Sequence, residues 1–398
     1  MPPIPPLAPG ADRAARDAYF RANAAAIYDR LTNGRTEFVR VDELCRRGAE
    51  AFPGLLPSAA ELADEAPRLQ RDKRGLEIDQ GLFLSSVLAD PIAGMHLCHA
   101  MLLPLPASKA RFADFDRHGE LDLGTAHVRR EGKAAIVTMR NPRFLNAEDE
   151  STLEPLETAI DIGLLDPKTD LCVLRGGPVT HSRHAGRRLF GAGINLTHLY
   201  HGRIRYLWYL VRDLGLVNKI YRGIAHPDMS PEIDAIEKLW IGALEGFAIG
   251  GHCQTVLTLD YVVAARDAYL TLPARKEGII PGAANLRLNR FVGARIARQA
   301  VMAELRIDCD SATGRLICDE IVEPAEMDAA LARIVEKLTG SGVVSAAGNR
   351  RAFRISEEPL DSFRRYMSVY AREQAHCHFS PALIANLERN WNAASRRA

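Results

Sequence analysis

Two short glycine-containing segments have the composition needed for the backbone itself to bind a ligand. They are Leu189–Leu196, with the sequence Leu-Phe-Gly-Ala-Gly-Ile-Asn-Leu, and Glu245–Gln254, with the sequence Glu-Gly-Phe-Ala-Ile-Gly-Gly-His-Cys-Gln. In each, small residues follow an apolar run, so a backbone N–H can approach a ligand without an intervening Cβ. Two such N–H groups can stabilise an oxygen that gains negative charge, which is the chemistry of an oxyanion hole.

The elements around the second segment indicate how it would be positioned. Leu239–Leu244 has the character of a strand, and Thr255–Leu259 continues as an apolar, helix-like stretch. This order predicts that Gly250 and Gly251 lie at the N-terminus of a helix. Backbone N–H groups there have no acceptor within the helix, and the helix dipole favours negative charge.

The chain resembles the crotonase, or enoyl-CoA hydratase/isomerase, superfamily from about residue 124 to residue 322. The resemblance rests on Leu145-Asn-Ala147, the Ala-Gly-x-Asn-Leu run, the Gly-Gly run and Ile280-Pro-Gly282, in the expected order. It implies an α/β fold with a crotonase-like ββα spiral core. It also implies that the N–H groups of Ile194 and Gly251 polarise the thioester carbonyl of an acyl-CoA.

Two positions depart from the pattern of the hydratases in this superfamily. The resemblance aligns their two catalytic glutamates with Gln254 and Ala274 of this chain. Neither a neutral amide nor an alanine can take up a proton at ordinary pH, so carboxylate acid/base chemistry is lost at both points. Stabilisation of an enolate remains as the expected chemistry.

A closer resemblance covers nearly the whole chain and is to the cofactor-independent dioxygenases of this superfamily. It implies that 3,5-dihydroxyphenylacetyl-CoA and dioxygen give 3,5-dihydroxyphenylglyoxylate and free CoA through an enolate, without a metal or a flavin. It also implies a role in supplying dihydroxyphenylglycine for glycopeptide antibiotics. The segments that carry this resemblance are Phe144–Asp149, Leu164–Pro167, Leu174–Gly177, Phe190–Leu196, Gly250–Gln254, Ser380–Ile384 and Asn386–Trp391.

The same resemblance assigns the acyl end of the substrate to Glu148, Arg212 and Gln254. A carboxylate, a guanidinium and an amide suit two phenolic hydroxyls, and such a site rejects analogues that lack the hydroxyl it must pair. Arg205 is an alternative to Arg212 because the chain is one residue shorter than the pattern there. The base that removes the α-proton is left open.

Three other groups of histidine, cysteine and arginine residues are weaker candidates. His252 and Cys253 are unlike a nucleophile pair because neighbouring residues on a helix point in different directions. The stretch His96–His99 lies in an apolar helical run and lacks a third well-spaced ligand, so core packing is favoured over a metal site. The basic loop His181–Arg188 is typical of a solvated loop, and contact with CoA phosphates is the alternative.

Composition and charge exclude several classes of protein. The chain has 398 residues, of which 47% are hydrophobic and 25% charged, as expected of a large globular protein. A formal net charge of +1 gives no electrostatic reason to expect nucleic acid or a membrane as partner. The 7 cysteines are dispersed without a Cys-x-x-Cys pair, and we find no signal peptide or spanning segment. A cytoplasmic enzyme is expected.

The pattern predicts three regions: a helical N-terminal lobe over 1–123, a crotonase-like acyl-CoA core over 124–323, and a helical C-terminal region over 324–398 for active-site cover and oligomerisation. The segment His201–Pro231 has helical apolar spacing and is expected to cover the acyl group. The elements predicted elsewhere are helices at Ala11–Leu31, Gly81–Leu103 and Ser151–Leu165, and strands at Ala126–Arg130, Lys133–Met139 and Leu171–Leu174.

Two other functions remain open at this point. One is a different acyl-CoA enzyme of the same superfamily, such as an isomerase, a thioesterase, a decarboxylase or a hydratase-like enzyme. The other is a non-catalytic acyl-CoA-binding subunit, suggested by the missing carboxylates. Only the dioxygenase consumes oxygen. The resemblance also implies a homo-oligomer, either a trimer or a hexamer.

Overall fold

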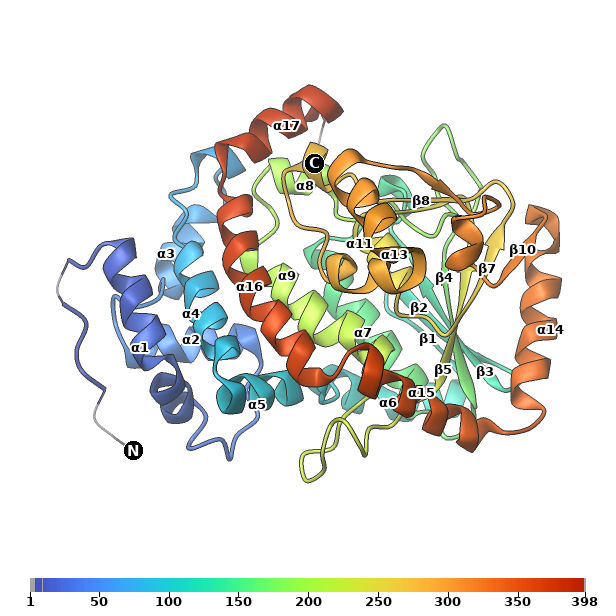
Figure 1. Cartoon of the computed structure of the whole chain (residues 1–398), viewed down its shortest axis with the longest axis horizontal. Coiled ribbons are helices and arrows are strands. Elements are labelled where there is room, and N and C mark those ends of the chain that lie inside the picture. Colours follow the sequence, from blue (N-terminus) through green and yellow to red (C-terminus); the bar gives the residue numbers. More distant parts are fainter. Residues whose placement is uncertain (1–3, 9, 397–398) are drawn as a thin grey trace.

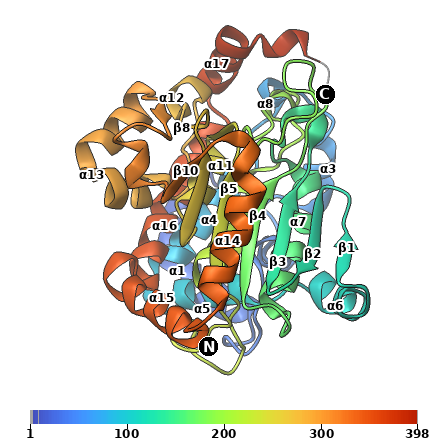
Figure 2. The ribbon, with the colours of Figure 1, turned by 90° about the vertical axis from the view of Figure 1, so that its right-hand side faces the viewer.

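A seven-stranded sheet with the order β1-β2-β3-β4-β5-β7-β10 forms the centre of the computed structural model, which describes residues 4–8 and 10–396. The first three strands pair antiparallel and the others pair parallel. Helix α14 (Met327–Thr339) lies on one face of this sheet and α7 (Glu150–Leu165) on the other (Figures 1 and 2). The strands are β1 (Glu120–Asp122), β2 (Ala126–Glu131), β3 (Ala134–Met139), β4 (Leu171–Gly176), β5 (Leu239–Leu244), β7 (Tyr261–Ala265) and β10 (Glu320–Val322).

The apolar runs explain why the central strands are buried on both faces. Every residue of β3 and β4 is buried, the pattern of a parallel sheet covered by helices on both sides. The two predicted strands around Glu131-Gly132 form the β2–β3 hairpin, and Gly132 has a φ of 56°, which a glycine adopts without strain. The predicted strand at residues 171–174 and helix at residues 151–165 are also present.

A second sheet of three short strands, in the order β6-β8-β9, leads directly into the candidate site. Its strands are β6 (Phe247–Ile249), β8 (Tyr269–Thr271) and β9 (Ile307–Asp308). The chain leaves β6 through Gly250 and enters α11 (Gly251–Val256) at once. Gly250 is the N-cap residue, so both glycines lie at a helix N-terminus as predicted. The helix ends at Val256, earlier than the predicted apolar stretch.

The N-terminal part of the chain is helical, and one correction applies to it. The helix predicted over residues 81–103 is two helices, α4 and α5, because Asp90 accepts hydrogen bonds from the N–H groups of Ile92 and Ala93 and Pro91 begins a new helix. The helices here are α1 (Arg13–Leu31), α2 (Val41–Ala51), α3 (Ala59–Glu65), α4 (Ile78–Ala89), α5 (Pro91–Leu102) and α6 (Pro106–His118). In the described part of the chain no single helix meets the length and hydropathy of a membrane span; residues 78–89 and 91–118 meet them only jointly, across a bend of 110°.

The remaining helices link the N-terminal helices to the central sheet. Helix α16 packs along α4 and α5 and crosses in front of α9 (Figure 1). One continuous apolar core extends from α1 to α17, so the region boundaries near residues 123 and 323 stay a prediction. These helices are α8 (Leu196–Tyr200), α9 (Tyr206–Val211), α10 (Val217–Arg222), α12 (Ala274–Glu277), α13 (Ala284–Ala303), α15 (Val343–Glu357), α16 (Leu360–His378) and α17 (Pro381–Trp391).

Candidate functional site

The two glycine-containing segments lie side by side. The N–H of Gly191 donates to the Phe247 carbonyl at 3.0 Å, and the N–H of Ile249 donates to the Gly191 carbonyl at 3.0 Å. A Cβ on Gly193 would lie 2.6 Å from the Ile249 carbonyl oxygen, so this crossing requires a glycine. Two segments that are distant in sequence therefore form one backbone unit.

The N–H groups of Ile194 and Gly251 differ from those of their neighbours. Gly193 donates its N–H to Nδ1 of His252, and Gly250 donates its N–H to the Thr271 carbonyl, both at 2.9 Å. Within residues 4–8 and 10–396, the N–H groups of Ile194 and Gly251 have no acceptor. Both residues line the same cavity of about 30 Å³. The cavity thus contains two backbone N–H groups that are available to a ligand oxygen.

His252 holds one of these turns in place as a neutral ring. It is fully buried, and burial together with the nearby charge of Arg212 lowers its pKa to about 4 although Glu148 opposes the shift. Its Nδ1 is the acceptor for Gly193, the residue before Ile194. Burial raises the pKa of the adjacent Cys253 thiol to about 12. A neutral, structural histidine beside a protonated thiol does not make a nucleophile pair.

Arg212 is the centre of a buried polar cluster. Its Nε–H lies 2.9 and 3.0 Å from the two oxygens of Glu148, and its two terminal nitrogens donate to four further acceptors. Those acceptors are Asp213 Oδ1 at 2.9 Å, Gln254 Oε1 at 2.6 Å, the Gly251 carbonyl at 2.8 Å and Thr255 Oγ1 at 3.1 Å. Every N–H of the guanidinium is therefore engaged.

A π-helical turn explains how Arg212 reaches this position. Residues 212–216 form the turn between α9 and α10, and both Arg212 and Asp213 line the cavity. Neighbouring residues of a regular α-helix diverge by about 100°, whereas a π-bulge locally alters this spacing and is frequent at functional sites. The alternative residue, Arg205, lies elsewhere: its side chain is 53% exposed and pairs with Asp42 and Glu150.

Glu148 is tied to the same unit through its backbone and its side chain. Its N–H donates to the Gly193 carbonyl and its carbonyl accepts from Asn195, both at 2.7 Å. Burial opposes ionisation, but the charge and hydrogen bonds of Arg212 outweigh it and the pKa of Glu148 is lowered. The carboxylate lies behind Gly251, where a Cβ would be 2.8 Å from Oε2, and it is not part of the cavity lining.

Gln254 and Asp213 complete the cluster on the cavity side. The Gln254 amide accepts from Arg212 and donates to Asp213 Oδ1 at 3.0 Å. Burial raises the pKa of Asp213 even though Arg212 and Gln254 oppose the shift. The sequence analysis did not identify Asp213 as a site residue. Its position directly after Arg212 could have indicated it.

A second residue that the sequence analysis did not identify is Glu277, which lines the same cavity beside Gly250. Ala274, which the resemblance aligns with a hydratase glutamate, begins α12, and Glu277 follows one helical turn later on the same side. Glu277 is 5% exposed and lines the cavity. Burial alone raises its pKa to about 7. The spacing of three residues between Ala274 and Glu277 could have indicated that Glu277 lies on the same face of the helix.

The cavity is small in this structure. About 30 Å³ holds one or two water molecules, which is too little for an aromatic ring. Aromatic and apolar side chains form the rest of the wall, including Trp208 and Tyr209 of α9 and Tyr370 of α16. The segment expected to cover the acyl group thus supplies part of the wall, and so does a C-terminal helix.

The other candidates from the sequence lie outside this cavity. His96 is hydrogen-bonded to the Tyr28 hydroxyl, and His99 is hydrogen-bonded to the His226 carbonyl. In the basic loop, Arg187 pairs with Asp267 and Arg188 approaches the Gly176 carbonyl. The described residues contain no group of three or more histidine, cysteine or acidic side chains arranged to hold a metal ion.

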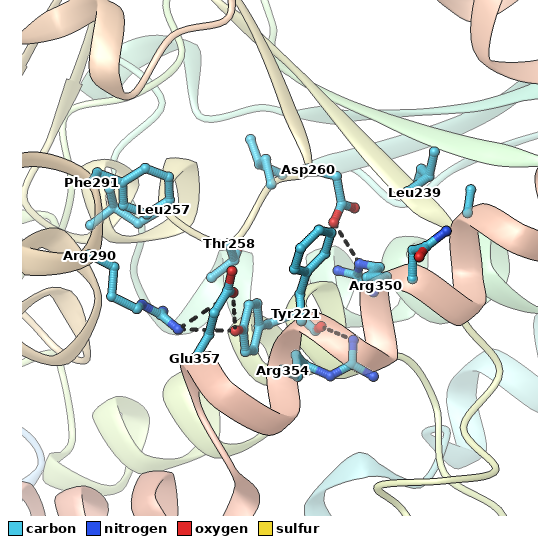
Figure 3. Close-up of a pocket in the computed structure, with 14 residues that line it drawn as sticks. Tyr221, Leu239, Leu257, Thr258, Asp260, Arg290, Phe291, Arg350, Arg354 and Glu357 are labelled. Atoms are coloured by element: carbon cyan, nitrogen blue, oxygen red, sulfur yellow. Dashed lines mark hydrogen bonds and ion pairs between the residues drawn. The ribbon is translucent and has the colours of Figure 1, made fainter.

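A larger cavity of about 440 Å³ lies among α10, α13 and α15 and contains none of the predicted site residues (Figure 3). Its arginines are already paired: Arg350 with Asp260 at 2.8 Å, Arg290 with the Tyr221 hydroxyl at 3.1 Å, and Arg354 with the Tyr221 carbonyl at 3.1 Å. Size alone therefore does not identify the site, and we assign it to the small cavity where the free N–H groups meet.

The chain belongs to the enoyl-CoA hydratase/isomerase family, whose model matches residues 129–359. It is 47% identical over 364 residues to the (3,5-dihydroxyphenyl)acetyl-CoA 1,2-dioxygenase of Amycolatopsis orientalis, a match that covers 91% of this chain and 83% of that protein. It is 26% identical over 233 residues to a short-chain-enoyl-CoA hydratase of Clostridium acetobutylicum, which covers 58% of this chain and 82% of the relative.

Solved structures agree on the fold. The enoyl-CoA hydratase of Mycobacterium avium subsp. paratuberculosis K-10 matches with a TM-score of 0.56 and 18% identity, over 70% of this chain and 100% of that one. The enoyl-CoA hydratase of Bacillus halodurans matches with a TM-score of 0.55 and 19% identity, over 67% of this chain and 100% of that one. The predicted crotonase-like α/β fold is confirmed.

Proposed function

We propose that this protein is a cofactor-independent dioxygenase that converts 3,5-dihydroxyphenylacetyl-CoA and dioxygen into 3,5-dihydroxyphenylglyoxylate and free CoA. The observation that carries the proposal is the 47% identity to the Amycolatopsis orientalis dioxygenase over 91% of the chain. The two unpaired N–H groups in one buried cavity support it, because such groups suit a thioester enolate.

In the proposed mechanism the thioester carbonyl accepts hydrogen bonds from the N–H groups of Ile194 and Gly251. Loss of an α-proton gives an enolate that is delocalised into the electron-rich ring, and this carbanion reduces dioxygen. The resulting α-peroxide attacks the thioester carbonyl and expels CoA. Cleavage of the O–O bond with loss of the second α-proton leaves the arylglyoxylate, so one thioester and one dioxygen give one glyoxylic acid and one CoA thiol.

The roles proposed for the polar cluster follow from its contacts. Gln254 lines the cavity and can present its amide to a phenolic hydroxyl. Because the N–H groups of Arg212 are engaged, Arg212 and Glu148 act on the hydroxyls either after a rearrangement or by holding Gln254 and Asp213 in place. In both cases the cluster recognises the phenolic hydroxyl groups, which phenylacetyl-CoA lacks.

A kinetic comparison of two substrates tests this reading of the aryl group. Replacing Gln254 or Glu148 by alanine should lower kcat/KM for 3,5-dihydroxyphenylacetyl-CoA about tenfold or more while sparing phenylacetyl-CoA. Equal losses on the two substrates would contradict the proposed role of the cluster. The exposed alternative Arg205, replaced by methionine, serves as a control that should change neither value.

Oxygen uptake measured together with CoA release tests the function itself. Chelator-treated, colourless protein is mixed with 3,5-dihydroxyphenylacetyl-CoA, with an anaerobic control. We expect chelator-insensitive uptake of dioxygen in step with CoA release. CoA release without oxygen uptake would instead indicate a thioesterase, and binding without turnover would indicate an acyl-CoA-binding subunit or a different acyl group.

Three further proposals concern location, pathway and assembly; the first rests on the composition and the other two on the resemblance. The protein acts in the cytoplasm, it belongs to a pathway that supplies dihydroxyphenylglycine for antibiotics, and it assembles as a trimer or a hexamer. A sizing measurement that gives the monomer mass of 43.8 kDa would contradict the assembly.

A further inference from the structure

Glu277 differs from the other buried carboxylates near the cavity because no described residue pairs with it. Within residues 4–8 and 10–396, its carboxylate has no ion-pair or hydrogen-bond partner, and burial is the sole cause of its altered acidity. Glu148 and Asp213, in contrast, both bond to Arg212. An isolated buried carboxylate destabilises a protein, so its presence in a cavity wall calls for a function.

The position of Glu277 relative to the two free N–H groups suggests that function. A Cβ on Gly250 would lie 3.9 and 4.0 Å from the two Glu277 oxygens, and Gly250 directly precedes Gly251. Ile194, Gly251 and Glu277 all line the same cavity. The α-carbon of a thioester is one bond from the carbonyl carbon, so a carboxylate close to an oxyanion hole is within reach of the α-hydrogens of a thioester bound there.

The C-terminal helices hold the segment that carries Glu277. The side-chain amides of Asn386 and Asn390 in α17 donate to the carbonyls of Arg275 and Lys276, at 3.3 and 3.1 Å, and so bind the short helix α12 from outside. Gln374 of α16 accepts from the N–H of Ile280 at 2.8 Å. The segment Asn386–Trp391, which carries part of the resemblance, therefore supports the helix on which Glu277 lies.

We propose that Glu277 is the catalytic base that removes the α-proton of the bound thioester, an inference that rests on the proposed function. The Cα–H bond breaks, its electron pair enters the enolate held by Ile194 and Gly251, and the proton forms an O–H bond on the Glu277 carboxylate. That proton then serves to protonate the departing CoA thiolate. The carboxylate is thereby restored.

The acidity of Glu277 suits this role. Its pKa of about 7 is where a general base is most effective at neutral pH. The rate of α-proton removal should rise with pH through about 7, because only the ionised carboxylate accepts a proton. Other titratable groups lie near Glu277. In the cavity lining they are Tyr209, Arg212, Asp213 and Tyr370. Behind the lining, His378 is hydrogen-bonded to Tyr209, and Glu148 and His252 lie behind Gly251.

Exchange of the α-protons for deuterium in D2O, followed by NMR without oxygen, isolates this step. Wild-type protein with 3,5-dihydroxyphenylacetyl-CoA should exchange them, and Glu277→Gln should exchange them at least about 100-fold more slowly. Its affinity for a non-exchanging thioether analogue should be unchanged. Glu277→Asp should recover part of the rate with a shifted pH midpoint. Glu373→Gln, the same change at an exposed site on α16, is the matched control and should behave as wild type.

The outcomes separate this inference from the proposed function. If wild type consumes oxygen and folded Glu277→Gln exchanges within about threefold of wild type, Glu277 is not the base while the dioxygenase assignment stands. If wild type shows neither exchange nor oxygen uptake, the proposed function fails and this inference fails with it. Thermal unfolding of each variant confirms that a slow variant is folded.

Discussion

Two parts of the small cavity's lining differ in how they stabilise buried charge: the polar wall, formed by Arg212 and its partners, and the wall that contains Glu277. On one wall Arg212 bonds to Glu148, Asp213 and Gln254, and the net effect lowers the pKa of Glu148. On the other wall Glu277 has no ion-pair or hydrogen-bond partner among the residues that the structure describes, and burial raises its pKa to about 7. The first arrangement stabilises the charge of Glu148, although burial still raises the pKa of Asp213, and so suits positioning and recognition. The second keeps a carboxylate near the point where it gains and loses a proton, which suits catalysis.

Removing the guanidinium is the most severe test of the polar wall. Arg212→Met should lower the free energy of unfolding by about 3–5 kcal/mol, because two carboxylates are left buried without their cation. The shift is measured by urea denaturation at pH 7. Arg205→Met is the matched control: its ion pairs are exposed, so it should cost less than about 1 kcal/mol. A small effect at Arg212 would contradict the comparison.

Neutralising Glu277 should raise the free energy of unfolding, whereas removing Arg212 should lower it. Since the folded pKa of Glu277 is raised above its ordinary 4.5 to about 7, folded wild type loses stability as pH rises through that window. Glu277→Gln removes this loss and should be more stable than wild type at pH 8, on the order of 3 kcal/mol. Thermal or urea unfolding of both proteins at pH 5 and pH 8 measures it. A constant difference across that range would show that Glu277 is not the isolated group described above.

The same substitution at Glu148, on the polar wall, should have the opposite effect on stability from Glu277→Gln. The folded pKa of Glu148 is lowered, so its ionised form contributes stability that is present above the ordinary pKa of 4.5 and lost as pH falls through the folded value. Glu148→Gln should therefore cost about 1–3 kcal/mol at pH 7, and the difference from wild type should shrink in acid. Urea unfolding from pH 3 to pH 7 measures it. A stabilising effect at pH 7 would remove the distinction between the two walls.

The smallest expected effect concerns the support of α12. Asn390→Ala removes the hydrogen bond to the Lys276 carbonyl and should cost about 1 kcal/mol of stability. It should also slow α-proton exchange about two- to fivefold, because the helix that carries Glu277 is held less firmly. Asn349→Ala removes a comparable bond within α15 and should leave the exchange rate unchanged. Equal rates of α-proton exchange in the two variants would show that the contact from α17 does not affect catalysis.

Much of the fold was predictable because its patterns are local. The hairpin at Glu131-Gly132, the apolar strand at residues 239–244 and the glycines at a helix N-terminus all follow from short-range spacing. The predicted helix over residues 81–103 was wrong because an apolar run continues across Asp90-Pro91, where capping and the proline ring begin a new helix at a sharp angle.

The sequence by itself determined the family, the two backbone turns and the absence of the hydratase carboxylates at Gln254 and Ala274, since each depends on residue type at fixed spacing. Tertiary structure decided which arginine faces the cavity, because the π-helical turn at residue 212 changes the helical spacing. It also decided that Glu277 has no partner in the described part of the chain. Whether a carboxylate has a partner depends on what packs around it in space, and its pKa follows from that packing.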